Sequence, residues 1–115
     1  MATLLIVDDN PEMRRMIGQI VAAKGDLVVE CADGDEVIEA YVAHQPDWVL
    51  MDVDMKRMDG LQATAALTEL HPQAKVVIVT KHVDDETRRA AREAGALCFV
   101  SKDDLLFLRT VVHQT

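Results

Sequence analysis

The sequence Trp-Val-Leu-Met-Asp-Val-Asp-Met at residues 48–55 carries the strongest fold signal in this chain. Four apolar residues run directly into Asp52, which is typical of a strand that is buried on both faces and ends at the rim of a sheet. A second apolar run, residues 3–7, ends in the same way at Asp8 and Asp9. A buried carboxylate is costly to keep charged unless a cation or a chemical task accompanies it. The two runs therefore predict three carboxylates at one edge of a sheet.

Length and composition favour one globular domain over residues 1–115, since half of the residues are apolar and suffice for one core. No apolar run reaches the roughly 20 residues of a membrane span, and the first residues do not resemble a signal peptide. We therefore expect a cytoplasmic protein. The net charge of −8 argues against direct binding of nucleic acid, which needs a basic face.

Strand-like and helix-like segments alternate five times along the chain. Asn10 and Pro11 start the first helix, and Asp33 with Glu36 forms a capping box for the second. The strands are expected at residues 3–7, 27–31, 48–51, 75–80 and 96–100, and the helices at 11 to about 24, from 33, between 60 and 70, at 84–94, and from about 103. The second helix has the apolar face Val37, Ile38, Tyr41 and Val42, and the third has Ala63, Ala66, Leu67 and Leu70.

This alternation predicts an α/β fold, a doubly wound sheet of five parallel strands joined by right-handed crossovers, with helices on both faces. Ligands of such sheets bind beyond the carboxyl ends of the strands, where the strand order reverses. Five polar residues lie at the carboxyl ends of predicted strands and are expected at this edge: Asp8, Asp9, Asp52, Thr80 and Lys102. Cys31 and Cys98 fall on different strands, expected at opposite edges of the sheet and too far apart for a disulfide.

The residues at this edge point to phosphoryl chemistry. Close carboxylates repel one another, and a hard cation such as Mg²⁺ relieves that repulsion while it keeps positions open for phosphate oxygens. Asp52 could then attack phosphorus as a carboxylate nucleophile and become an aspartyl phosphate. Mg²⁺, Lys102 and the Thr80 hydroxyl would neutralise or hydrogen-bond the three phosphoryl oxygens.

With these motifs in order, the whole chain resembles a response-regulator receiver domain, the phosphoacceptor of bacterial two-component signalling. The resemblance implies a flavodoxin-like, CheY-like fold with strand order 2-1-3-4-5. It implies that Asp52 accepts a phosphoryl group from a sensor histidine kinase or a histidine phosphotransfer protein. Asp9, Asp52 and the backbone carbonyl of Asp54 would bind Mg²⁺ directly, and Asp8 would act largely through water.

The resemblance also implies a switch that carries the signal to a protein target. Thr80 would move toward the phosphoryl group and Phe99 would rotate into the space vacated, so that the face formed by the fourth helix, fifth strand and fifth helix changes shape. Such a domain is not an enzyme in the usual sense, but assists its own phosphorylation and dephosphorylation.

Three positions depart from the family pattern. Lys56 stands where the loop usually has proline, and Asp103 follows Lys102 where the family usually has a proline with a cis peptide bond. Lys81 follows Thr80, where alanine or glycine usually borders the entrance to the phosphoryl group. The long cation of Lys81 could restrict entry of small phosphodonors and water, or attract the phosphoryl group.

Two features of the predicted surface bear on partners. Arg88, Arg89 and Arg92 gather on the fourth helix, either as a solvated face paired with nearby acids or as a docking site for an acidic partner. The apolar run at residues 105–108 covers more than one helical stripe, so Leu106 or Phe107 should be exposed, which suggests a partner contact or a homodimer.

Several alternatives stay open at this level. Asp8 and Asp9 could be only a cap cluster, and Asp52 only a turn residue. The chain could also be the receiver part of a longer regulator with an output domain beyond Thr115, or a receiver-like module that binds partners without phosphorylation. Residues 52–54 further resemble the opening of the haloacid dehalogenase phosphatase motif, although Lys56 departs from it.

Overall fold

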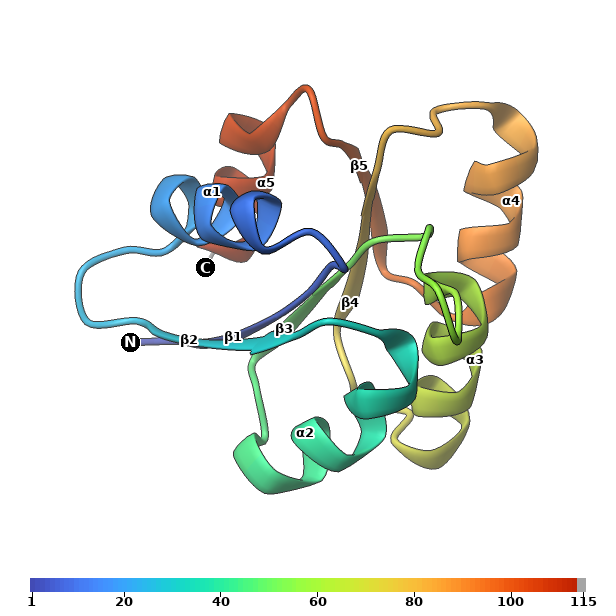
Figure 1. Ribbon diagram of the computed structural model, residues 1–115, viewed down its shortest axis with the longest axis horizontal. Helices are drawn as coiled ribbons and strands as arrows, with labels where there is room; N and C mark the ends of the chain where they lie inside the picture. Colours follow the sequence, from blue (N-terminus) through green and yellow to red (C-terminus); the bar gives the residue numbers. More distant parts are fainter. Residues whose placement is uncertain (114–115) are drawn as a thin grey trace.

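Five parallel strands form the centre of the computed structural model, which describes residues 1–113. The strand order is β2-β1-β3-β4-β5, and each neighbouring pair is parallel (Figure 1). The strands are β1 Thr3–Val7, β2 Leu27–Cys31, β3 Trp48–Met51, β4 Val76–Thr80 and β5 Cys98–Ser101. The predicted fold class and strand order are thereby confirmed. The predicted end of the domain at residue 115 lies outside the described residues.

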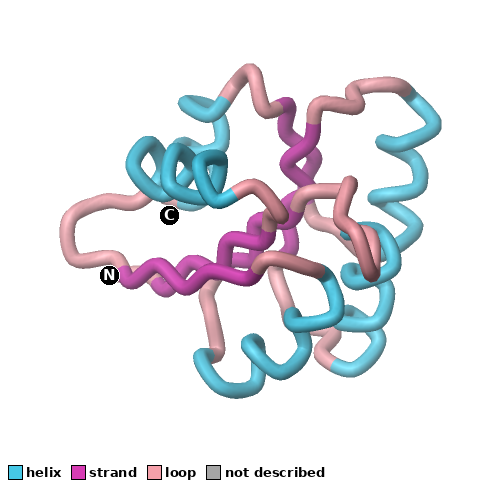
Figure 2. Tube along the Cα trace, viewed as in Figure 1, coloured by secondary structure: helices cyan, strands magenta, loops and turns pink. Residues whose placement is uncertain are grey.

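Helices cover both faces of the sheet. Helices α1 and α5 pack together on one face, whereas α2, α3 and α4 lie on the other (Figures 1 and 2). The helices are α1 Pro11–Val21, α2 Val37–His44, α3 Gly60–Leu70, α4 Asp85–Ala94 and α5 Leu105–Val112, with a short 3₁₀ turn, η1, at Gly34–Glu36 before α2. None of these helices is long and apolar enough to cross a membrane.

The central strands supply side chains to two separate cores, one on each face. Val49 and Met51 of β3 face the core under α2, α3 and α4, and Leu50 faces the core under α1 and α5. All three residues are no more than 1% exposed. Because successive side chains of a strand point to opposite faces, an uninterrupted apolar run is what a doubly covered strand requires.

The first helix ends earlier than the sequence predicts. The apolar spacing predicts a helix to about Lys24, but the helix stops at Val21, and Ala22 has an extended backbone with ψ 138°. The carboxylate of Asp26 accepts a hydrogen bond from the Ala23 N–H at 2.8 Å, and Gly25 adopts φ +92° in the turn. The Asp26 carboxylate satisfies a backbone N–H group that would otherwise continue the helix. The pattern of apolar residues does not show where such a bond forms.

The second helix also starts later than predicted, and the capping box is not formed. Asp33 caps only the 3₁₀ turn, and the Glu36 carboxylate receives the Ala32 N–H at 3.5 Å instead of returning to Asp33. Val42, predicted to be in the apolar face of α2, is 57% exposed. In α3 the predicted core residue Leu70 is likewise 61% exposed.

In place of Leu70, the α3 face buries Thr64, whose hydroxyl donates to the Gly60 carbonyl at 2.7 Å. The bounds of the last two strands differ slightly from the prediction, because β4 begins at Val76 and β5 begins at Cys98 and ends at Ser101. Both cysteines are free and occupy the opposite edge strands, as expected. Burial raises the pKa of the Cys31 thiol to about 11, so this residue is an unreactive part of the core.

Candidate functional site

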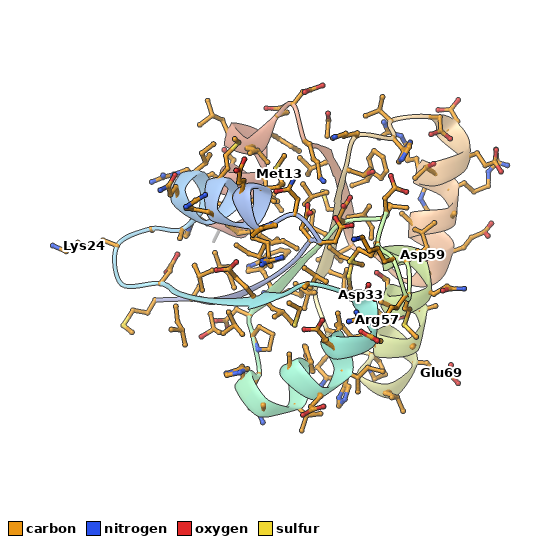
Figure 3. All side chains as sticks on the ribbon, in the orientation of Figure 1. Met13, Lys24, Asp33, Arg57, Asp59 and Glu69 are labelled. Carbon is orange, nitrogen blue, oxygen red and sulfur yellow. The ribbon has the colours of Figure 1, made fainter. Side chains whose placement is uncertain are left out.

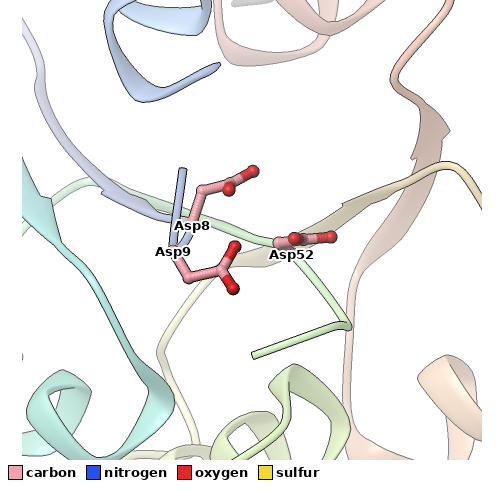
Figure 4. Close-up of side chains that lie close together, drawn as sticks. All are labelled: Asp8, Asp9 and Asp52. Atoms are coloured by element: carbon pink, nitrogen blue, oxygen red, sulfur yellow. The ribbon is translucent and has the colours of Figure 1, made fainter. Parts of the chain in front are cut away.

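Three aspartates meet at the carboxyl edge of the sheet, between the ends of β1 and β3. Asp8 is 1% exposed and Asp52 is 6% exposed, whereas Asp9 is open to solvent. One carboxylate oxygen from each lies within 4.8 Å of the others, the arrangement drawn in Figure 4. The chain leaves β1 toward β2 and leaves β3 toward β4, so this is the point where the strand order reverses. The predicted convergence of the three acids is confirmed.

Backbone contacts explain why these side chains reach the same point. The Asp52 N–H donates to the Val7 carbonyl at 2.9 Å, so that the β1–β3 ladder continues into the acidic residues. Immediately after the loop, Gly60 packs against the backbone of Asp52. A Cβ at residue 60 would lie 1.8 Å from the Asp52 carbonyl oxygen, which makes glycine necessary there.

The cap-only interpretation of Asp8 and Asp9 does not fit the structure. Asn10 is the N-cap of α1 and its side chain accepts hydrogen bonds from the N–H groups of Glu12 and Met13. Asp8 is instead directed into the site, with only its Oδ1 bound locally to the Asn10 N–H.

Lys102 brings a cation from the end of β5 into the acidic cluster. Its Nζ lies 2.8 Å from Asp8 Oδ2 and 3.1 Å from Asp52 Oδ2, and its side chain is 8% exposed. The Lys102 N–H donates to the Thr80 carbonyl, which sets the chain direction at this point. No peptide bond in residues 1–113 is cis, so Lys102 reaches the acids through trans bonds, with Asp103 after it.

Burial and like charge shift the ionisation of this cluster. Burial, and next the nearby Asp8 carboxylate, raise the pKa of Asp52 even though Lys102 opposes this change. Burial disfavours the charge on Lys102, but the Asp8 and Asp52 carboxylates outweigh it and raise the Lys102 pKa. Both shifts have one origin, because a lysine ammonium lies between two buried carboxylates that repel each other.

The donor set fits a hard divalent cation. The buried Oδ2 of Asp8 accepts no hydrogen bond of regular geometry from the described residues, although Lys102 Nζ is close to it. Carboxylate oxygens with room for water are the ligands that Mg²⁺ prefers. The acids open into a cavity of about 170 Å³ that offers this room, lined by Asp8, Asp9, Asn10, Met13, Asp52, Asp54, Lys81 and Lys102.

The next two predicted residues differ in their relation to this cavity. Lys81 lines it, as expected for a residue at the entrance. Thr80 is fully buried at the end of β4 and does not line it; its hydroxyl accepts the His82 N–H at 3.1 Å.

His82 is a further residue near the site that its sequence pattern does not predict; its Nε2 lies 2.5 Å from Asp54 Oδ2. This contact joins the loop after β4 to the loop after β3. Its position in the sequence, two residues after Thr80 at the end of β4, could have indicated that it lies near the site. The spacing of the histidines gave no such indication.

Phe99 lies away from the acids, on the partner-facing side predicted from the resemblance. It is half-buried, and the Arg88 guanidinium lies 4.7 Å from its ring centroid. Arg88, Arg92, Phe99 and Phe107 share a groove of about 380 Å³ between α4, β5 and α5. Leu106 and Phe107 are 72% and 48% exposed, which confirms the expected apolar exposure.

None of the three α4 arginines forms an ion pair with another residue of the described chain, so the predicted pairing with nearby acids is not seen.

The model of the response regulator receiver domain family matches residues 4–111. The chain belongs to this family. Its sequence is 35% identical over 100 residues to the chemotaxis protein CheY of Bacillus subtilis, covering 86% of this chain and 83% of that protein. It is 31% identical over 99 residues to the CheY protein of Halobacterium salinarum, covering 86% of this chain and 82% of that protein.

Solved structures agree with this membership. A two-component response regulator of the LuxR family from Aurantimonas superposes with a TM-score of 0.87 at 28% identity, over 97% of this chain and 85% of the other. The chain is therefore a receiver domain of two-component signalling. Membership over nearly the whole chain removes the ground for the haloacid dehalogenase alternative, which rested on residues 52–54 alone.

Proposed function

We propose that Asp52 is the phosphoacceptor of this receiver domain. The observation that carries the proposal is the buried Asp52 carboxylate, which opens into the acidic cavity while Lys102 Nζ lies 3.1 Å away. An Asp52 oxygen attacks the phosphorus of a phosphohistidine, so that a P–O bond forms and the P–N bond breaks. The leaving imidazole nitrogen keeps the electron pair and takes up a proton.

The chain's own residues would hold the cation that this transfer requires. Asp9, Asp52 and the backbone carbonyl of Asp54 would bind Mg²⁺ directly, and Asp8 would hold it through water. When bound, Mg²⁺ neutralises charge that develops on the phosphoryl oxygens. The support is the set of three carboxylates within 4.8 Å and the buried Asp8 oxygen that lacks a regular hydrogen bond.

Lys102 and Thr80 complete the phosphoryl site. Lys102 already lies between two carboxylates and neutralises one phosphoryl oxygen without a large movement. Thr80 reaches another oxygen with its hydroxyl once the contact with the His82 N–H is given up. Lys81 lines the cavity, where it restricts the approach of small phosphodonors and of water.

The groove between α4, β5 and α5 carries the signal to a protein target. Phe99 sits at this groove, and the pairing of Thr80 with Ser101 across the β4–β5 ladder joins the site to the strand that carries Phe99. Movement of Thr80 toward the phosphoryl group frees space for Phe99, and the ring then leaves Arg88. The partners are a histidine kinase or phosphotransfer protein and a downstream protein, with no direct contact to nucleic acid. The domain is a phosphoacceptor that assists its own turnover, not an enzyme acting on a separate substrate.

Labelling the purified protein tests the proposal. It is incubated with Mg²⁺ and either an acyl phosphate or a promiscuous phosphohistidine kinase, alongside Asp52→Asn and Asp54→Asn variants. We expect label in the wild type and in Asp54→Asn, because the Asp54 side chain is exposed and only its backbone carbonyl is needed. We expect none in Asp52→Asn or without Mg²⁺. A folded wild type that takes label from neither donor would point to a module that binds partners without phosphorylation.

A further inference from the structure

The loop between β3 and α3, residues 53–59, is fastened to the rest of the protein by the carboxylate of Asp33. Asp33 is 2% exposed and follows β2 (Figure 3). Its Oδ2 accepts the Arg57 N–H and its Oδ1 accepts the Met58 N–H, each at 2.9 Å. The bond to the Asp35 N–H, at the start of η1, is longer at 3.4 Å. The two shortest hydrogen bonds of this side chain therefore go to the loop and not to the helical turn that it caps.

Asp33 stays ionised in this buried position. Burial by itself raises the pKa of the carboxyl group, but hydrogen bonds from the Arg57, Met58 and Asp35 N–H groups outweigh burial and lower it. Both oxygens are then acceptors at neutral pH, and each serves a separate N–H group of the loop. An uncharged amide at this position could offer only one oxygen.

Two neighbouring contacts reinforce the attachment of the loop. The Arg57 guanidinium lies 2.7 Å from Asp35 Oδ2 and 3.2 Å from Glu36 Oε2, on the protein surface. A Cβ at Gly34 would lie 2.4 Å from the Met58 carbonyl oxygen, so the turn presses directly against the loop backbone. Exposed ion pairs contribute little, because solvent and salt screen their charges. The buried Asp33 bonds are therefore the main attachment.

We propose that Asp33 is a positioning residue for the cation site, because it sets the path of the loop that carries the Asp54 carbonyl. This inference rests on the proposed function, in which that carbonyl is a Mg²⁺ ligand. The loop contains no proline, and Lys56 leaves its backbone without the fixed φ that proline imposes. Attachment at residues 57 and 58 supplies the missing restraint.

Calorimetric titration of Mg²⁺ into the folded protein, without a phosphodonor, tests this role. Asp33→Asn and Asp33→Ser both keep a good N-cap oxygen but cannot bind two loop N–H groups at once. We expect each variant to bind Mg²⁺ about 10-fold more weakly, the range seen when residues that orient metal ligands are changed. Amide NMR signals of residues 53–58 should shift in the same variants.

Asp26 provides a matched control. Its carboxylate is also buried and also accepts two backbone N–H groups, from Ala2 and Ala23, but it lies at the other end of β2. Asp26→Asn should lose about as much thermal stability as the Asp33 variants. Its Mg²⁺ affinity should stay within about 2-fold of wild type, because the titration is made on folded protein and Asp26 lies far from the loop. Arg57→Ala, which removes only the exposed pairs, should change the affinity less than about 3-fold.

The outcomes separate the two proposals. Wild-type affinity in folded Asp33→Asn or Asp33→Ser would overturn the positioning role and leave the proposed function intact. An equal loss of affinity in Asp26→Asn would also overturn it, because the effect would then be one of general destabilisation. A wild type that binds no Mg²⁺ at all would overturn the cation site itself, and the positioning role with it.

Discussion

Asp52 is the residue at which function and stability conflict. Its charged form is disfavoured by burial and by Asp8, so its pKa is raised. In the absence of metal, we expect Asp52→Asn to increase the free energy of unfolding at pH 7 by on the order of 1 kcal/mol, a typical single-residue effect. Urea denaturation in the presence of a chelator measures this difference.

The increase in the free energy of unfolding that Asp52→Asn brings should depend on pH in a definite direction. A carboxyl whose pKa is raised in the folded state binds its proton more tightly there, so its destabilising effect is full above the folded pKa. The effect disappears as pH falls through that pKa and below the ordinary value of 3.8. The advantage of Asp52→Asn should therefore be largest at neutral pH and vanish in acid. An advantage that grows toward acid would contradict the assignment of burial as the cause.

Lys102 should have the opposite effect on stability. Lys102→Ala leaves Asp8 and Asp52 buried side by side without a cation, and breaking a buried ion pair by removal of one partner costs about 3 kcal/mol or more. We expect the free energy of unfolding of metal-free Lys102→Ala, measured by urea denaturation at pH 7, to fall by this amount. The control is Lys24→Ala, which removes an exposed lysine (Figure 3) and should leave the free energy of unfolding within about 0.5 kcal/mol of wild type.

At the scale of elements, the contact between α4 and β5 should restrain Phe99. Arg88 stacks on the Phe99 ring, a contact worth about 0.5–1 kcal/mol at an exposed site. Arg88→Ala removes it, so the ring should occupy the inward position about 2- to 5-fold more often without phosphorylation. Ring NMR signals of Phe99 measure this shift. Arg89→Ala, on the same exposed helix but with no such contact among the described residues, should leave the signals unchanged; equal shifts in both variants would refute the stacking role.

The elements that could be predicted from the sequence are those fixed by burial. The short apolar run at residues 48–51 favoured a strand covered on both faces, because a strand with one face in solvent alternates apolar and polar residues. The rim residues Asp8, Asp52 and Lys102 then followed from the strand ends. Helix limits were less predictable. They depend on which side chain finds a backbone partner, and Asp26 and Asp33 bind N–H groups that no local pattern distinguishes.

The contacts missed from the sequence join different loops. His82 meets Asp54 across 28 positions of sequence, and Asp33 meets Met58 across 25. Each side chain has an ordinary local explanation, as a surface histidine or as a helix cap. Only the doubly wound topology, which brings the loops after β2, β3 and β4 to one edge, makes them neighbours.

At the scale of the whole molecule, the charge of −8 and the acidic site should make the fold respond to Mg²⁺. A ligand at ten times its Kd stabilises the native state by about 1.4 kcal/mol, which corresponds to a rise of about 5 °C in the Tm of a domain of this size. Part of any rise would come from general screening of an acidic protein, so the comparison is made against NaCl of equal ionic strength. Asp9→Asn removes an exposed acid at the site and should abolish the specific rise, whereas Asp47→Asn, at the far end of the sheet, removes the same charge and should keep it. Equal rises in wild type and Asp9→Asn would mean that Mg²⁺ acts on the net charge and not at the three carboxylates.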